Sequence, residues 1–173
     1  MTDARHAPVR QSSAACERNR DPILGVLREV LPSEGLVLEI ASGTGMHAAW
    51  MAKHLPSITW QPSDTGDEAL LSIEAWREHE QLSNLRSPIR LDVTASAWPV
   101  ERADAMFCAN MIHIAPWICA LSLFEGAARV LAPGAPLVLY GPFTVMGKHT
   151  APSNEAFDRS LRERDPRWGV RDV

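Results

Sequence analysis

Two glycines after an apolar run form the clearest candidate for a ligand-binding turn in this sequence. The run at residues 36–40 is followed, after Ala41, by Ser42-Gly43-Thr44-Gly45. Glycines one residue apart after a strand let the backbone approach a ligand closely, as in dinucleotide-binding turns. Any tight strand-to-helix turn also needs glycine, so the motif alone leaves a ligand-binding and a purely structural interpretation open.

Acidic residues stand near this turn and at the ends of two later apolar runs. Glu39 lies within the first run, where a carboxylate is costly to bury unless it has a partner. Asp64 and Asp92 each follow a short apolar run, and Asp64 comes about 20 residues after the glycines, as a ribose-binding acid does. Turn or helix-capping acids are the alternative interpretation of both aspartates.

Three polar residues in the second half of the chain are candidates for a chemical step. Asn110 and His113 lie at and just after the end of an apolar run, and Tyr140, the sole tyrosine, ends another. Histidine is the side chain among these that titrates near neutral pH, so His113 is the candidate base. A structural hydrogen bond is the alternative role for His113, and a place in the core is the alternative for Tyr140.

Alternating strands and helices must position these residues. Apolar patterns predict strands at residues 36–40, 58–61, 89–91, 103–109 and 137–140. They predict helices at residues 23–31, 48–55, 68–79, 121–131 and 154–164. This alternation indicates an α/β, Rossmann-like, doubly wound parallel sheet. Ligands of such sheets bind beyond the carboxyl ends of the strands, where the candidate residues fall.

The composition predicts one soluble, cytoplasmic domain. The chain has 173 residues, of which 46% are hydrophobic, and a formal net charge of −4, which favours no nucleic-acid partner. No run is long and apolar enough for a membrane span, and three cysteines without a CxxC pair suggest no metal site. We expect residues 1–35 to form an N-terminal segment and helix, 36–143 the cofactor-binding core, and 144–173 a C-terminal loop and helix.

Several blocks of the sequence together resemble a known superfamily. The acid-x-x-x-Gly-x-Gly turn, the acids ending the next two strands and a Pro-Gly turn before the fifth resemble class I S-adenosylmethionine-dependent methyltransferases. More narrowly, the chain resembles the methyltransferase-like protein 26 family in six blocks: Glu17–Pro22, Glu39–Gly45, Trp60–Asp64, Asn110–Ile114, Tyr140–Phe143 and Arg164–Gly169. The resemblance covers almost the entire chain and implies methyl transfer from S-adenosylmethionine, but it does not identify the acceptor. No Asp/Asn-Pro-Pro-aromatic motif follows the fourth predicted strand, which argues against methylation of adenine or glutamine nitrogen, and we expect a small-molecule acceptor.

The resemblance also implies a set of site residues. Glu39 would accept a hydrogen bond from the cofactor's ammonium, Asp64 would bind the ribose hydroxyls, and Asp92 the adenine amino group, with the Val93 backbone nearby. His47 stands where we place the third glycine of the turn. The full cofactor-binding set is Glu39, Ala41, Ser42, Gly43, Gly45, Asp64, Asp92, Val93 and Asn110. The candidate catalytic residues are His113, Asn110 and Tyr140.

Charged residues outside this set allow two interpretations. Arg18, Asn19 and Arg20, predicted to precede the first helix, could close over the cofactor or hold a substrate carboxylate. A solvated turn is the alternative. The charges between Arg159 and Arg171 alternate in sign and predict a solvent-exposed helix.

Two other function classes share part of this pattern. An NAD(P)-dependent oxidoreductase would use the same turn, but the sequence has no Tyr-x-x-x-Lys pair. A binding protein that keeps the pocket without methylating is the other alternative. The superfamily sheet has seven strands, whereas no apolar strand is predicted after residue 143. We therefore expect five strands, with the last two missing, and a homodimer or other association through the exposed edge of the fifth. Coverage of this edge by the C-terminal tail or by residues 1–19 is the alternative.

Overall fold

The structure is a computed structural model that describes residues 9–173. Its helices are α1 (Ala14–Val30), α2 (Met46–His54), α3 (Asp67–Glu80), the short 3-10 helix η1 (Met111–His113), α4 (Trp117–Val130) and α5 (Pro152–Arg164). Its strands are β1 (Gly35–Ile40), β2 (Ile58–Asp64), β3 (Ile89–Arg90), β4 (Ala105–Ala109), β5 (Leu137–Tyr140), β6 (Thr144–Val145) and β7 (Lys148–His149).

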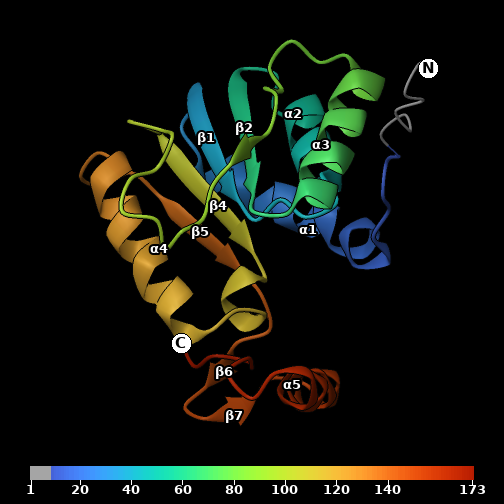
Figure 1. Ribbon diagram of the computed structural model, residues 1–173, viewed down its shortest axis with the longest axis vertical. Coiled ribbons are helices and arrows are strands. Elements are labelled where there is room, and N and C mark those ends of the chain that lie inside the picture. Colours follow the sequence, from blue (N-terminus) through green and yellow to red (C-terminus); the bar gives the residue numbers. More distant parts are fainter. Residues whose placement is uncertain (1–8) are drawn as a thin grey trace, which may run out of the picture.

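Five parallel strands form the central sheet, in the order β3-β2-β1-β4-β5. Figure 1 shows α1, α2 and α3 on one side of the sheet, α4 on the other, and α5 with the β6–β7 hairpin beyond the ends of β4 and β5. The predicted doubly wound α/β fold is therefore confirmed. Because the strand order reverses between β1 and β4, their carboxyl ends flank the point where such sheets bind ligands.

The central strands are buried on both faces, as expected for a parallel sheet covered by helices. Alternate residues of β1 and β4 point to opposite sides. Val37 and Phe107 pack with Leu27 of α1 in one core cluster. Leu38 and Met106 are part of the second cluster, which includes residues of α4. These two clusters hold β1 and β4 in place, and the carboxyl ends of these strands carry the candidate site.

The first helix begins nine residues earlier than the sequence predicts. Ser13 caps α1 by accepting a hydrogen bond from the Cys16 N–H at 3.3 Å, and Pro22 lies inside the helix. The sequence pattern places the start at Ile23, directly after Pro22, because proline is common at the beginning of a helix. Arg18 and Asn19 therefore lie on a helix, not on a turn before one.

Other boundaries also differ from the prediction. β2 continues through Pro62 to Asp64, although proline has no N–H to donate within the sheet and normally ends an inner strand. α4 begins at Trp117 instead of Leu121. The sequence pattern missed this first turn because its apolar residues Trp117 and Ile118 are exposed and do not belong to the buried face of the helix. The expected polar loop after residue 143 contains the short β6–β7 hairpin.

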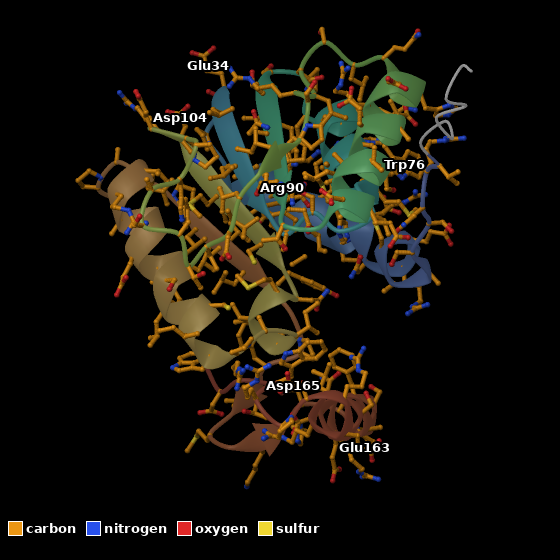
Figure 2. All side chains as sticks on the ribbon, in the orientation of Figure 1. Glu34, Trp76, Arg90, Asp104, Glu163 and Asp165 are labelled. Carbon is orange, nitrogen blue, oxygen red and sulfur yellow. The ribbon has the colours of Figure 1, made fainter. Side chains whose placement is uncertain are left out.

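The segment that precedes α1 is bound to α3. Trp76 of α3 donates its indole N–H to the Gln11 carbonyl at 2.9 Å, and Ser72 Oγ accepts from the Gln11 N–H at 2.9 Å. Figure 2 shows Trp76 on α3, facing the chain that leads into α1. Ser72 also donates to the Thr44 carbonyl at 2.7 Å, so the same residue fixes the turn after β1.

The outer strand β5 borders an apolar surface. As predicted, the described sheet has five strands, and no strand within residues 9–173 pairs with the second edge of β5. Exposed apolar residues of α4 lie on this side of the sheet, among them Trp117 and Phe124. Both line a cavity of about 370 Å³ together with Leu137, Leu139 and the C-terminal Val173. Within residues 9–173, no helix has the length and apolar character needed to cross a membrane.

Candidate functional site

The turn between β1 and α2 has three residues with positive φ at alternate positions. These are Ala41 at 54°, Gly43 at 55° and Gly45 at 84°. Glycine adopts this left-handed backbone conformation readily, whereas alanine does not. Ala41 is therefore the one position of the three where the conformation favours glycine and another residue stands. His47, expected from the sequence to replace the third glycine, lies inside α2 instead. Because the helix begins directly after Gly45, the departure from glycine at His47 does not alter the turn.

The two glycines of the turn have different surroundings. A Cβ on Gly45 would lie 2.8 Å from the Ile73 Cα of α3, so this glycine is required for the packing of the turn against that helix. A Cβ on Gly43 would meet no heavy atom within 4 Å. Gly45 therefore has a structural role, whereas Gly43 faces open space into which a ligand could fit.

Glu39 lies beneath the turn and is only 1% exposed. Its carboxylate accepts a hydrogen bond from the Trp60 indole N–H at 2.7 Å. Burial raises the pKa of Glu39 to about 7, although its hydrogen bonds with Trp60 and Ser42 act in the opposite direction. A buried carboxyl that is poised near neutral pH is typical of functional sites.

Asp64 connects the ends of β1 and β2. Its Oδ2 accepts from the Gly43 N–H at 2.9 Å, and its Oδ1 accepts from the backbone N–H groups of Thr65 and Gly66. The turn-acid interpretation is thus supported. Oδ1 already accepts two hydrogen bonds, whereas Oδ2 accepts one and keeps a second lone pair for a ligand donor. Ser42 joins the same group through its N–H, which donates to the Ser63 carbonyl at 2.8 Å.

Asp92 is placed beside Asp64 by the backbone. The Leu91 N–H donates to the Asp64 carbonyl at 3.0 Å, just before the exposed Asp92. Asp92 Oδ1 accepts from the Thr94 hydroxyl and backbone N–H, and these bonds lower the pKa of Asp92. Its Oδ2 makes no hydrogen bond within the described residues, and Val93 next to it is buried. The acids predicted from the sequence therefore lie along one edge of the sheet.

Asn110 and Tyr140 meet at the carboxyl ends of β4 and β5. The Asn110 N–H donates to the Tyr140 carbonyl at 2.8 Å, and Asn110 has a left-handed backbone with φ of 64°. Both residues line a cavity of about 670 Å³. The structure thus brings these two predicted residues together at an accessible site.

His113 is placed differently from the other two candidate catalytic residues. Its side chain is fully buried, and neither ring nitrogen has a hydrogen-bond partner within the described residues. The ring packs against Gly141, where a Cβ would lie 2.2 Å from Nε2, and its centroid is 4.9 Å from that of Phe143. Burial lowers the pKa of His113. Its role as a base stays a prediction that requires residues 141–143 to move.

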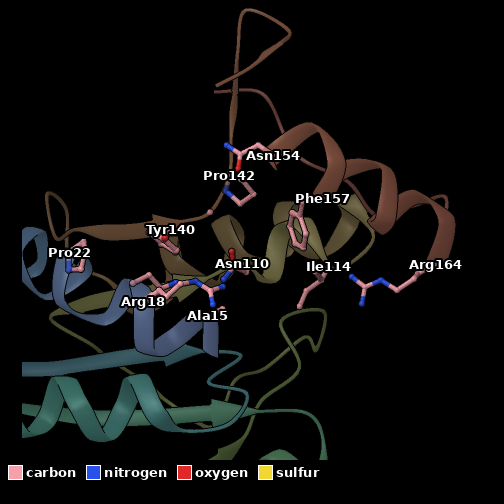
Figure 3. A pocket seen from close by; sticks show the side chains of 12 residues that line it. Ala15, Arg18, Pro22, Asn110, Ile114, Tyr140, Pro142, Asn154, Phe157 and Arg164 are labelled. Carbon is pink, nitrogen blue, oxygen red and sulfur yellow. The ribbon is translucent and has the colours of Figure 1, made fainter. Parts of the chain in front are cut away.

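The cavity lies between α1, the ends of β4 and β5, and α5. Figure 3 shows Arg18 reaching from α1 toward Asn110, with Phe157 and Arg164 contributed by α5. The full lining is Ala15, Arg18, Asn19, Pro22, Asn110, Ile114, Tyr140, Gly141, Pro142, Asn154, Phe157 and Arg164.

Sequence reasoning missed the contribution of α5. Asn154, Phe157 and Arg164 follow helical spacing, with the buried Leu161 on the same face. This spacing was the signal available in the sequence, but the alternating charges of the segment favoured the interpretation as a solvent-exposed helix. Arg20, by contrast, does not reach this cavity and lies over the Trp50 ring at 3.8 Å.

Comparison with solved structures shows a class I methyltransferase fold. A putative O-methyltransferase from Nostoc punctiforme has a TM-score of 0.76 and 17% identity, over 91% of this chain and 47% of that one. A putative methyltransferase from Bacillus halodurans has a TM-score of 0.65 and 24% identity, over 86% and 62%. The calicheamicin-biosynthesis methyltransferase CalO1, in its SAH-bound form, has a TM-score of 0.69 and 14% identity, over 90% and 45%.

The chain spans 45–62% of the length of these three structures. At such identities the likeness establishes the fold, and the narrower resemblance to the methyltransferase-like protein 26 family stays a prediction. Residues 10–173 match the model of a family described as a protein of unknown function, DUF938. The match covers nearly the whole chain, which therefore belongs to the DUF938 family.

Proposed function

We propose that the protein is an S-adenosylmethionine-dependent methyltransferase with a small-molecule acceptor. The observation that carries the proposal is the turn after β1, where Gly43 faces open space and donates its N–H to Asp64. This turn lies at the switch point of a class I methyltransferase fold. The structure of CalO1, which shares the fold, contains bound SAH.

The residues at this edge suit the parts of the cofactor. Asp64 Oδ2 keeps an acceptor position for a ribose hydroxyl, and Asp92 Oδ2 offers one to an amino group. Glu39 would lie below the ammonium group and interact with it directly or through water. Gly43 keeps the backbone free of a side chain where the methionine part would pass.

The chain itself mainly has to align the reactants. Bound S-adenosylmethionine supplies an electrophilic methyl group, so the protein contributes orientation and exclusion of water. Asn110 and Tyr140 line the adjoining cavity, where an acceptor would be held. His113 is buried behind Gly141, so proton removal by its ring would need a local rearrangement.

Calorimetric titration with S-adenosylmethionine, S-adenosylhomocysteine and NAD tests the proposal. We expect the first two to bind with micromolar affinity and NAD not to bind. Binding of NAD alone would overturn the proposal in favour of an oxidoreductase. Binding of S-adenosylhomocysteine without methyl transfer to any fraction of a small-molecule extract would support the non-catalytic alternative.

Replacing Asp64 with alanine is expected to weaken cofactor binding by about 1–3 kcal/mol, because a ribose hydroxyl would lose its acceptor. The variant also removes the bond to the Gly43 N–H, so the turn itself could loosen. A cofactor analogue without ribose hydroxyls separates the two effects in calorimetry. If Asp64→Ala weakens the analogue as much as the natural cofactor, the ribose role is wrong.

The open edge of β5 leads to a prediction about association. An unpaired strand beside an apolar surface tends to pair or to be covered, so we expect a homodimer through β5 and α4. Phe124→Lys on α4 should favour the monomer in sedimentation across a concentration series. A wild-type monomer at high concentration would contradict the prediction.

The cytoplasmic location and the organisation into an N-terminal segment, a cofactor-binding core and a C-terminal segment also stay predictions.

A further inference from the structure

The cavity beside Asn110 carries positive charge without an acid in its lining. Its two ionic residues are Arg18 on α1 and Arg164 on α5, and the other polar groups include the side chains of Asn19, Asn110 and Asn154. No aspartate or glutamate occurs among the twelve lining residues. Amides and guanidinium groups provide donors that favour an anion.

The arginines at the cavity differ from the other arginines of α5. Arg159 and Arg162 form ion pairs with Glu155 and Asp158 within that helix. Neither Arg18 nor Arg164 forms an ion pair within residues 9–173. The Arg164 guanidinium lies 5.4 Å from the Trp168 ring, which does not neutralise its charge. The two cations at the cavity are therefore available to a ligand.

The rest of the lining includes one amide side chain held in place by a hydrogen bond and an apolar wall. Asn19 Oδ1 lies 2.9 Å from His47 Nε2, and burial lowers the His47 pKa to about 4, so the neutral ring donates this bond. The amide nitrogen of Asn19 is left free to donate to a ligand. Ile114 and the rings of Tyr140 and Phe157 supply the apolar wall (Figure 3).

We propose that the acceptor is a small anion, bearing a carboxylate or a phosphate on an apolar or aromatic body. Arg18 and Arg164 bind the acidic group, since a guanidinium matches both kinds of oxyanion. Asn19 and Asn110 add neutral donors, while Tyr140 and Phe157 contact the apolar body. This inference rests on the proposed methyltransferase function and names the substrate class for the same site.

Fluorine NMR with matched probes tests the inference on the full chain saturated with S-adenosylhomocysteine. The probes are para-fluorobenzoate, para-fluorophenyl phosphate and the neutral para-fluorobenzamide. We expect at least one anionic probe to bind about tenfold more tightly than the amide. The carboxylate and phosphate arms show which oxyanion the site prefers. Equal affinities, or no binding of either anion at millimolar concentration, would overturn the proposal.

Substitutions on both helices locate the charge recognition. Arg18→Gln and Arg164→Gln should each reduce the preference for the anion severalfold, and the double variant should abolish it. Arg28→Gln on α1 and Arg159→Gln on α5 are matched controls, because neither residue lines this cavity. A preference that survives the double variant, or falls equally in the controls, contradicts the assignment.

A separate measurement keeps the two proposals distinguishable. Affinity for S-adenosylhomocysteine is measured by calorimetry in the wild type and in each variant. If the wild type does not bind it, the proposed methyltransferase function fails. If it binds and the probes show no charge preference, only the inference about the acceptor fails.

Discussion

A Gly43→Val variant is expected to stay folded and to lose about 3 kcal/mol of cofactor affinity, a factor of more than 100. A Cβ at this position meets no protein atom within 4 Å, so the added side chain enters space that we assign to the ligand. Titration with S-adenosylhomocysteine, together with thermal unfolding of the same sample, measures both consequences.

Gly134→Val is the matched control for backbone strain. Gly134 also has a positive φ, of 85°, and a Cβ there would meet open space, but it lies in the turn before β5. The two variants should lose similar stability, about 1–2 kcal/mol, and only Gly43→Val should lose binding. Normal binding by Gly43→Val would mean that the turn is merely structural.

Gly45→Ala should give the opposite result from Gly43→Val. Its Cβ would lie 2.8 Å from the Ile73 Cα, which cannot move without shifting α3. We therefore expect the free energy of unfolding to fall by about 2–4 kcal/mol, from overpacking and a positive φ together. A stable Gly45→Ala protein would show that α3 adapts to the turn.

Cofactor affinity is expected to rise with pH up to about pH 7, by up to tenfold per pH unit. The pKa of Glu39 is raised by burial to about 7, so the carboxyl of the free protein is mostly protonated at lower pH. An ammonium group prefers the ionised carboxylate, and binding must therefore release a proton in this range. Calorimetric titration of S-adenosylhomocysteine at several pH values measures the slope.

The same pKa has a consequence for the stability of the free protein. The folded carboxyl binds its proton more tightly than the unfolded one, whose ordinary pKa is 4.5. The tighter binding of this proton therefore stabilises the folded protein fully below about pH 4.5, and this contribution is lost as the pH rises through about 7. The shift corresponds to about 3 kcal/mol. His47, whose pKa burial lowers from 6.5 to about 4, has an opposite effect over nearly the same pH range. The Glu39 contribution is therefore measured as the difference between the wild type and Glu39→Gln in chemical unfolding at several pH values.

Glu39→Gln is the control variant for both measurements. Its amide oxygen can still accept the Trp60 indole N–H, while the charge is removed. We expect weaker binding whose pH slope is gone, and unfolding without the decrease assigned to Glu39. The same slopes in the variant would assign the titration to another group. His47 is not that group, because burial lowers its pKa to about 4 and its contribution to stability therefore rises with pH.

Alternation of apolar runs with helical patterns was sufficient to predict the sheet and the edge that carries the site. Strand ends can be read locally, so the sequence alone predicts Glu39, Asp64 and Asp92 at one edge. The beginning of α1 could not be read in this way. Pro22 is a local signal for a helix start, but the turns before it are held by contacts with α2, where Asn19 meets His47 and Arg20 lies over Trp50.

The sequence by itself determined the α/β class, the glycine turn and the acids at the strand ends, because each depends on neighbouring residues. Tertiary structure decided that Gly45 packs against Ile73 while Gly43 stays open. It also buried His113 against Gly141, and it brought Arg164 to the same cavity as Arg18, nearly 150 residues earlier. These outcomes depend on contacts between residues far apart in the chain, which local patterns do not encode.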